Sequence, residues 1–192
     1  LAALAVEVGA DWGCRLPGHR DAGREPDVQR SIPHIAVDVA RTCRVPLDVV
    51  GDDAMTREPE YRQSVVMKCV NNIKYHGGVS REKAVEFFST RKALLHMNLH
   101  FREPFGLAPV EAQLCGMPVI AFDNGAMREV IKDKETGFLV KSQCEVEKII
   151  KNGQLNSLKS KRCRDFASQF SKERMVKQYL ELATEAIETG GW

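Results

Sequence analysis

Short apolar runs alternate with amphipathic segments along most of the chain. Apolar runs that end at a glycine or a polar turn are typical of buried parallel strands, and apolar positions three and four residues apart are typical of helices. This pattern predicts strands over residues 1–8, 46–51, 72–76, 93–97, 118–122 and 137–140. It predicts helices over residues 33–43, 57–70, 80–89, 107–115, 126–132 and 145–188, the last with a break near Gly153. This alternation predicts an α/β fold, with a Rossmann-like parallel sheet and helices on both faces.

The N-terminal part of the chain does not follow this pattern. Residues 9–33 are rich in Gly, Pro and Arg and show neither a strand period nor a helix period. A structureless loop of this length is uncommon inside a compact domain. We therefore divide the chain into a poorly defined N-terminal strand and loop over residues 1–33 and a Rossmann-like domain with C-terminal helices over residues 34–192.

The composition is that of a folded globular protein. The 192 residues are 43% hydrophobic and 28% charged, with a net charge of +2, which argues against a disordered chain and indicates no nucleic-acid partner. No apolar stretch is long enough to span a membrane, and the N-terminus lacks the basic region of a signal peptide. The six cysteines form no C-x-x-C pair. We therefore expect a cytoplasmic domain without a structural metal site.

The densest signal for chemistry lies between residues 102 and 120. A predicted strand precedes this segment, a turn leads into a helix that begins near Gly106, and another strand follows. Pro109 falls in the first helical turn, where its missing N–H costs nothing. The free N–H groups of Phe105, Gly106 and Leu107, together with the positive end of the helix dipole, form an anion site that suits phosphate.

Two carboxylates flank this predicted phosphate site. Glu103 lies on the loop before the helix, and Glu111 follows eight residues later, about one turn into the helix. A carboxylate accepts two hydrogen bonds, so each of these residues suits a vicinal diol. A phosphate site between two groups that bind diols fits a nucleotide sugar, with its ribose on one side and its hexose on the other.

These residues carry a family resemblance. The segment Glu103-Pro-Phe-Gly-Leu, followed by Glu111-Ala and then by Cys-Gly-x-Pro-Val-Ile, resembles the E-x7-E signature of retaining glycosyltransferases of family 4 (group 1). The resemblance spans roughly residues 33–140 and includes Pro33-His-Ile-Ala and Glu135-Thr-Gly-Phe-Leu-Val140. It implies a GT-B fold, in which two Rossmann-like domains face each other across a cleft and the C-terminal domain binds the donor nucleotide sugar.

The resemblance also implies roles for five residues. Glu103 corresponds to the glutamate that contacts the hydroxyls of the transferred sugar, and we expect it to be the catalytic residue. Phe105, Gly106 and Leu107 correspond to the backbone segment at the sugar and diphosphate, and Glu111 corresponds to the glutamate that holds the ribose. The family takes a nucleotide diphosphate sugar as its substrate. It generally needs no metal or other cofactor, because the helix dipole and basic side chains neutralise the leaving diphosphate.

Several other polar residues lie near strand ends. Tyr75 and His76 fall where relatives place nucleobase contacts. His100 stands three residues before Glu103 on the same loop, where it could touch the substrate. His96 has no ligand-like spacing to the other histidines, so we interpret it as structural or solvent-facing.

The segment before residue 34 departs from the family pattern. Relatives bind the donor diphosphate with an Arg and a Lys that precede the P-H-x-A segment, whereas this chain has Val28-Gln-Arg-Ser-Ile-Pro33 there. Arg24 or Arg30 would have to substitute for that pair. The sequence also contains no counterpart of the N-terminal GT-B domain, so we expect the parent protein or a partner chain to supply that domain and the acceptor site.

Two segments allow more than one interpretation. The turn Asn124-Gly125-Ala126 could line the donor pocket or be an ordinary turn. Residues 141–177 contain ten Lys or Arg against four Asp or Glu, which is typical of a solvated helical face. Such a face could also draw the domain to an anionic membrane leaflet as a peripheral contact.

The sequence therefore predicts the donor-binding domain of a retaining hexosyltransferase. The alternative is a degenerate, non-catalytic Rossmann-like module that serves in protein interactions, which the altered residues 9–33 favour. A nucleotide-sugar epimerase is a third reading, against which the Glu103-Pro-Phe-Gly-Leu segment argues.

Overall fold

The computed structural model describes residues 4–8, 33–51, 59–98 and 102–189. Its strands form a six-stranded sheet in which all neighbouring strands run parallel, in the order β3-β2-β1-β4-β5-β6. This is the strand order of a Rossmann-type fold, and it reverses between β1 and β4. The strands are β1 Leu4–Val8, β2 Leu47–Gly51, β3 Ile73–Gly77, β4 Ala93–His96, β5 Val119–Phe122 and β6 Gly137–Val140.

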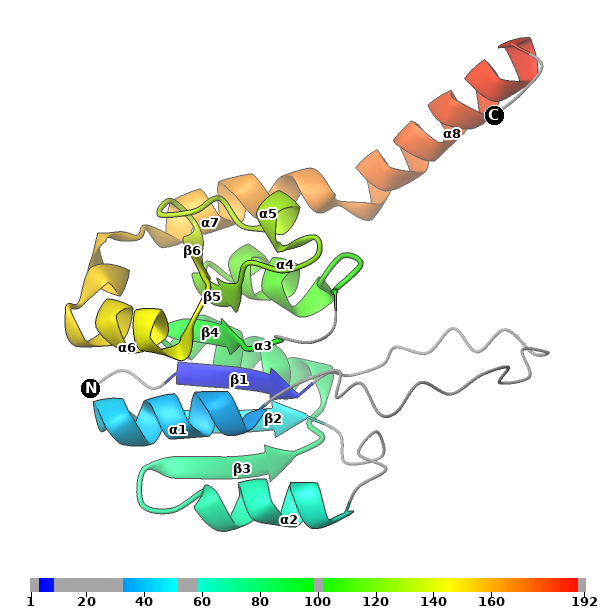
Figure 1. Cartoon of the computed structure of the whole chain (residues 1–192). Helices are drawn as coiled ribbons and strands as arrows, with labels where there is room; N and C mark the ends of the chain where they lie inside the picture. Colours follow the sequence, from blue (N-terminus) through cyan, green and yellow to red (C-terminus); the bar gives the residue numbers. More distant parts are fainter. Residues whose placement is uncertain (1–3, 9–32, 52–58, 99–101, 190–192) are drawn as a thin grey trace.

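Helices cover both faces of the sheet (Figure 1). On one face α1 contacts α2 and α6, and on the other α4 contacts α3 and α7. The α-helices are α1 Pro33–Cys43, α2 Pro59–Lys68, α3 Arg81–Thr90, α4 Leu107–Leu114, α5 Met127–Val130, α6 Gln143–Lys151, α7 Ser160–Ala167 and α8 Lys172–Thr189, and the 3-10 helices are η2 Gln154–Ser157 and η3 Ser168–Phe170. The architecture confirms the predicted α/β fold with a parallel sheet between two layers of helices.

Successive residues of the central strands point into two separate hydrophobic cores, one on each face of the sheet. In β4, Leu94 packs into the core beneath α4 and α7, whereas Leu95 packs into the core beneath α1 and α6. In β5, Val119 and Ile120 divide in the same way. A parallel sheet that is buried on both faces requires apolar residues at consecutive positions, which is why these strands appear in the sequence as unbroken apolar runs.

The N-terminal strand lies at the centre of this sheet. β1 pairs with β2 on one side and with β4 on the other, so the sheet includes a strand from the 1–33 segment that the sequence analysis set apart from the domain. Arg24 and Arg30 lie outside the described residues, and so does His100.

The C-terminal region is divided more finely than the sequence pattern predicts. The expected break at Gly153 is present, and this residue has a positive φ of 65°. Two further breaks occur at Leu158 and Ser171, whose backbones are extended, with ψ values of 139° and 151°. The continuous helix predicted after Gly153 is therefore wrong: η2, α7 and α8 are separate there.

The last helix leaves the domain. α8 extends away from the sheet (Figure 1), and none of its residues is buried. Its exposed large apolar side chains are Met175, Val176, Tyr179, Leu180, Leu182 and Ile187. None of the described helices is long and apolar enough to cross a membrane.

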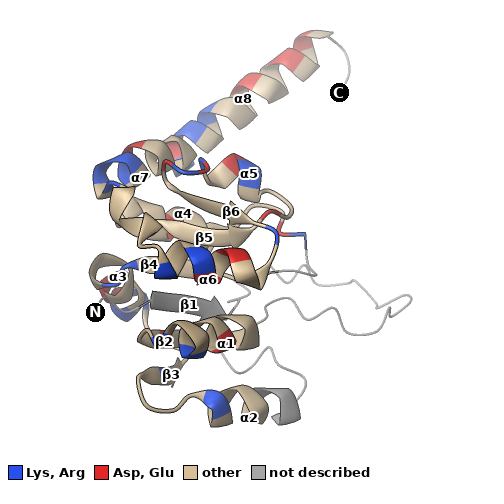
Figure 2. Cartoon of the chain, turned by 60° about the vertical axis from the view of Figure 1, so that its left-hand side comes forward, with Lys and Arg blue, Asp and Glu red and all other residues tan. Residues whose placement is uncertain are grey.

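Basic side chains gather on α7 (Figure 2). Part of this charge is neutralised locally, because Lys161 Nζ lies 2.8 Å from Asp165 Oδ2 and Arg162 pairs with Glu135. Ion pairs of this kind at the surface contribute little to stability.

Candidate active site

The predicted chemical segment lies at the carboxyl ends of the parallel strands. Residues 102–106 lie between β4 and α4 and lead into that helix, and the turn 123–126 connects β5 to α5. β4 is also the strand beside β1 at which the strand order reverses. In open parallel sheets, ligands bind in the crevice outside the carboxyl ends of the strands at such a reversal.

Helix α4 begins without a side-chain cap. Its N-cap residue is Gly106, which has a left-handed backbone (φ 91°, ψ 74°) and no side-chain hydrogen bond. A Cβ on this residue would lie 2.6 Å from the terminal carbon of Met127 and in a backbone region that favours glycine. Helix α4 therefore begins at a buried glycine, with no capping side chain.

Glu103 lies next to two polar residues from the end of β4, the mostly buried His96 and the buried Asn98. Its Oε2 accepts a hydrogen bond from Asn98 Nδ2 at 3.3 Å and lies 3.9 Å from His96 Nε2. Burial lowers the pKa of His96 to about 4, so its imidazole is neutral at pH 7 and the contact with Glu103 is not an ion pair. The interpretation of His96 as merely structural or solvent-facing missed this neighbourhood, and Asn98 was not singled out at all.

The turn after β5 packs directly against the backbone of Glu103. The Ala126 N–H donates a hydrogen bond to the Glu103 carbonyl oxygen at 2.9 Å. Gly125 has a φ of 56°, and a Cβ there would lie 2.6 Å from the Glu103 nitrogen. Arg128 forms a two-pronged hydrogen bond with Asp123 at 2.6 and 2.7 Å, which holds the pKa of that carboxyl below its usual value. The turn therefore fixes the position of Glu103.

Replacing Gly125 with alanine is expected to lower the melting temperature by about 5–10 °C, because a left-handed residue with a Cβ is strained and the new methyl group meets the Glu103 backbone. Gly77→Ala is the matched control: Gly77 has a similar φ of 67°, but nothing lies within 4 Å of an added Cβ. It should cost only about 2–4 °C. Equal melting temperatures for the two variants, measured by calorimetry, would contradict the close packing at Gly125.

The remaining predicted site residues have different surroundings. Glu111 lies on α4 with its side chain 42% exposed, and its Oε1 is 3.7 Å from Nη2 of Arg81 at the start of α3. Leu107 is exposed. The ring of Phe105 packs edge-on against Phe170 with a centroid distance of 5.6 Å. The Phe105 side chain thus connects the loop to η3. The contact of the Phe105 backbone with the donor sugar and diphosphate stays a prediction.

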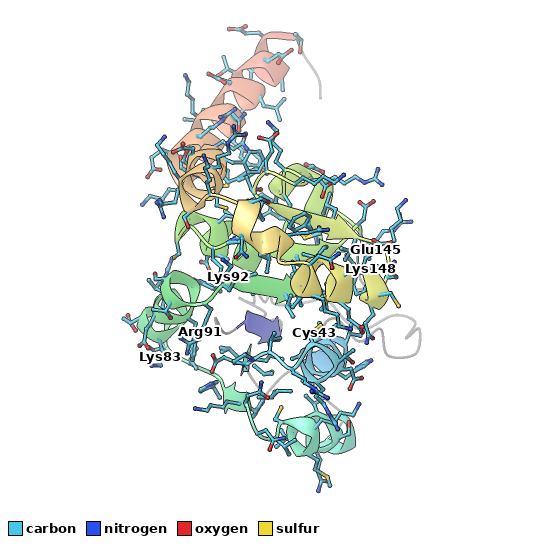
Figure 3. The ribbon with its side chains drawn as sticks, turned by 90° about the vertical axis from the view of Figure 1, so that its left-hand side faces the viewer. Cys43, Lys83, Arg91, Lys92, Glu145 and Lys148 are labelled. Atoms are coloured by element: carbon cyan, nitrogen blue, oxygen red, sulfur yellow. The ribbon has the colours of Figure 1, made fainter. Side chains whose placement is uncertain are left out.

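Tyr75 and His76 point to opposite faces of β3. Tyr75 packs against the core that contains α1. His76 Nε2 lies 2.7 Å from Asp48 Oδ1 on the other face, where Arg91 Nε donates to Asp48 Oδ2 at 2.6 Å. Figure 3 shows Arg91 near Lys83, and both cations lie over the ring of Phe87. The two side chains therefore do not converge on one nucleobase.

Comparison with known proteins assigns the family. The family described as glycosyl transferases group 1 matches residues 37–173, a range that includes Glu103, Glu111 and the turn after β5. The chain belongs to this family. The resemblance seen in the E-x7-E segment is thereby confirmed.

Individual relatives of this glycosyltransferase domain are longer than the chain. A protein from the cps region of Klebsiella pneumoniae is 35% identical over 117 residues, which are 58% of this chain and 32% of that protein. The N-acetyl-alpha-D-glucosaminyl L-malate synthase of Bacillus anthracis is 27% identical over 179 residues, which are 85% of this chain and 42% of that enzyme. The chain thus spans less than half the length of these relatives.

Solved glycosyltransferase structures share the fold. Anabaena HepE in complex with UDP and glucose superposes with a TM-score of 0.73 at 22% identity, over 95% of this chain and 48% of that one. Sucrose-phosphate synthase from Thermosynechococcus elongatus gives a TM-score of 0.70 at 21% identity, over 98% of this chain and 46% of that one. The glycosyltransferase domain therefore has the fold of about half of such an enzyme.

Within this glycosyltransferase domain, the described residues include no cluster of three or more His, Cys, Asp or Glu side chains that could hold a metal ion.

Proposed function

We propose that this chain is the donor-binding domain of a retaining glycosyltransferase that takes a nucleotide diphosphate sugar. The observation that carries the proposal is the juxtaposition of Glu103, held by Asn98 and by the Ala126 N–H, with the uncapped start of α4. In the proposed complex, the amides at Gly106 and Leu107 bind the diphosphate, and Glu103 accepts hydrogen bonds from hydroxyls of the sugar.

The proposed chemistry is electrostatic. In the transfer step, the bond between the anomeric carbon and the diphosphate oxygen breaks, and a bond to the oxygen of an acceptor hydroxyl forms on the same face of the sugar. The acceptor hydroxyl gives its proton to the departing diphosphate oxygen, and the nucleoside diphosphate leaves. Negative charge then grows on the diphosphate, where the positive end of the α4 dipole stabilises it without a metal. Glu103 keeps the sugar oriented during this step, and Glu111 holds the ribose hydroxyls at the other end of the donor.

We further propose that a second GT-B domain, from the parent protein or a partner chain, binds the acceptor and covers α8. The chain matches less than half of the length of its relatives, which supports this proposal. So does the exposed apolar face of α8, because a helix in water gains most of its stability from packing of such a face. The identity of the acceptor is not part of this proposal. A peripheral contact of the basic α7 surface with a membrane leaflet stays an expectation from the sequence.

The proposal predicts that nucleotide sugars raise the melting temperature of the chain. UDP-glucose, GDP-mannose and ADP-glucose are the probes. A ligand at 100 times its dissociation constant stabilises the folded chain by about 2.7 kcal/mol. For a chain of this length, that corresponds to a rise in melting temperature of roughly 5–10 °C. Glu111→Ala should remove most of the shift, because the ribose loses its acceptor.

Glu86→Ala serves as the control for that experiment. Glu86 is an exposed acid on α3 that pairs with Lys83, and its loss should leave the shift unchanged. If no nucleotide sugar shifts the unmodified chain at millimolar concentration, the non-catalytic interaction module becomes the better interpretation.

A further inference from the structure

Asn98 is a buried polar residue whose two polar atoms have different surroundings. It lies two residues after the end of β4 and is only 6% exposed. Its Nδ2 donates to Glu103, whereas its Oδ1 is buried and has no hydrogen-bond partner among the described residues. The carboxylate fixes the orientation of this amide, because the reverse orientation would place Oδ1 against a carboxylate oxygen.

Of the three described residues with such an atom, two contact Glu103. In the part of the chain that the structure describes, three buried side-chain polar atoms have no partner, and they belong to His96, Asn98 and Gln113. Two of these residues approach the same oxygen, Glu103 Oε2. A buried carbonyl oxygen without a partner loses its hydration without a compensating bond, so it suggests a missing ligand.

Gln113 provides the contrast. Its Nε2 donates to two backbone carbonyls, those of Pro109 at 3.0 Å and Val130 at 2.7 Å. These bonds join α4 to the end of α5 and explain the burial of Gln113 as structural. Among the described residues, the Asn98 side chain hydrogen-bonds to Glu103 and not to the backbone of a helix or strand, so no comparable structural role explains its burial there.

We propose that Asn98 is a donor-sugar residue: its Nδ2 orients the Glu103 carboxylate, and its Oδ1 accepts a hydrogen bond from a hydroxyl of the transferred sugar. This inference rests on the proposed function. Asn98 and Glu103 then offer two neighbouring acceptors, which two O–H donors can satisfy together. The class of sugar that fits is a hexose with two adjacent free hydroxyls, one for each side chain.

The test compares a nucleotide with its sugar conjugate. Dissociation constants of UDP, UDP-glucose, GDP and GDP-mannose are measured by calorimetry for the unmodified chain and for Asn98→Ala. The variant is expected to weaken the binding nucleotide sugar by about 5- to 20-fold and the corresponding nucleoside diphosphate by less than about two-fold. Asn152→Ala, the same substitution at an exposed helix end, should change neither constant.

Each other outcome is decisive. Equal weakening of nucleotide and nucleotide sugar would make Asn98 a structural residue, and no weakening at all would remove it from the sugar site. If the unmodified chain binds the nucleoside diphosphate but gains nothing from the sugar, the inference about Asn98 fails while nucleotide binding stands. If the unmodified chain binds neither ligand, the proposed function fails, and this inference fails with it.

The first half of a second measurement uses the unmodified chain alone, so it does not depend on how well the variant folds. Donor analogues that each lack one sugar hydroxyl are titrated into the unmodified chain, where two adjacent positions should each lose affinity. In Asn98→Ala, the loss at one of those two positions should disappear, because the acceptor of that hydroxyl is gone. A loss at no position, or at a single position, would overturn the pairing of Asn98 with Glu103.

Discussion

Replacing Glu103 with glutamine is expected to remove the sugar-dependent part of donor binding while leaving the fold intact. Glutamine has the same shape, but it lacks the negative charge and one of the two acceptor oxygens. In the complete two-domain enzyme that we propose, transfer should fall by about 100- to 1,000-fold, the range seen when one preorganised electrostatic group is lost.

Two measurements check this prediction. Calorimetry on the chain should show that Glu103→Gln weakens the nucleotide sugar and leaves the nucleoside diphosphate almost unchanged. Glu129→Gln is the matched control, because Glu129 is an exposed acid on the nearby α5. Unaltered transfer by Glu103→Gln in the two-domain enzyme would exclude Glu103 from the catalytic site.

The second large effect concerns pH. Burial lowers the pKa of His96 from 6.5 to about 4, and Glu103 is the charged group that faces it. Between these values the unfolded chain binds a proton at this position and the folded chain does not. The stability contributed by the neutral imidazole is therefore fully present above pH 6.5 and is lost as the pH falls, by about 1.4 kcal/mol per pH unit and roughly 3 kcal/mol in all by pH 4.

A leucine at position 96 should remove this dependence. His96→Leu cannot bind a proton, so its free energy of unfolding should fall less steeply between pH 6.5 and pH 4 than that of the unmodified chain. Chemical denaturation at a series of pH values measures the difference. Asn152→Leu, at an exposed helix end, is the control, because it introduces a leucine without removing a titratable group, and it should keep the original slope. Parallel curves for His96→Leu and the unmodified chain would refute the burial argument.

Much of the architecture could be predicted because its signals are local. Apolar runs define the buried strands, and Ser80 accepts a hydrogen bond from the Lys83 N–H at the start of α3, as its position in the sequence predicts. The break at Leu158 could not be predicted, since leucine has no special preference for a helix end. The break at Ser171 carries the same local signal as Ser80, because the Ser171 hydroxyl accepts a hydrogen bond from the Arg174 N–H at 3.2 Å, and the prediction of a continuous helix missed it. The order of the strands depends on contacts between distant segments, which periodicity does not encode.

The candidate site shows the same division. The E-x7-E segment indicates Glu103 and the start of α4 directly, because both belong to one strand–turn–helix unit. Asn98 and His96 follow an apolar run and resemble the polar end of an ordinary strand. Only their burial beside Glu103 distinguishes them, and burial is a property of the folded chain. The contact between Phe105 and Phe170 was likewise hidden, because it joins two distant segments.

The central claim is that the donor diphosphate binds at the start of α4, and amide NMR of the 15N-labelled chain tests it most directly. On addition of UDP, GDP or ADP, the nucleotide that binds should cause its largest shifts at the amides of Gly106, Leu107 and Ala108. The corresponding nucleotide sugar should add shifts at Asn98 and Glu103. Largest shifts on the basic helix α7, with the α4 amides unmoved, would contradict the claim.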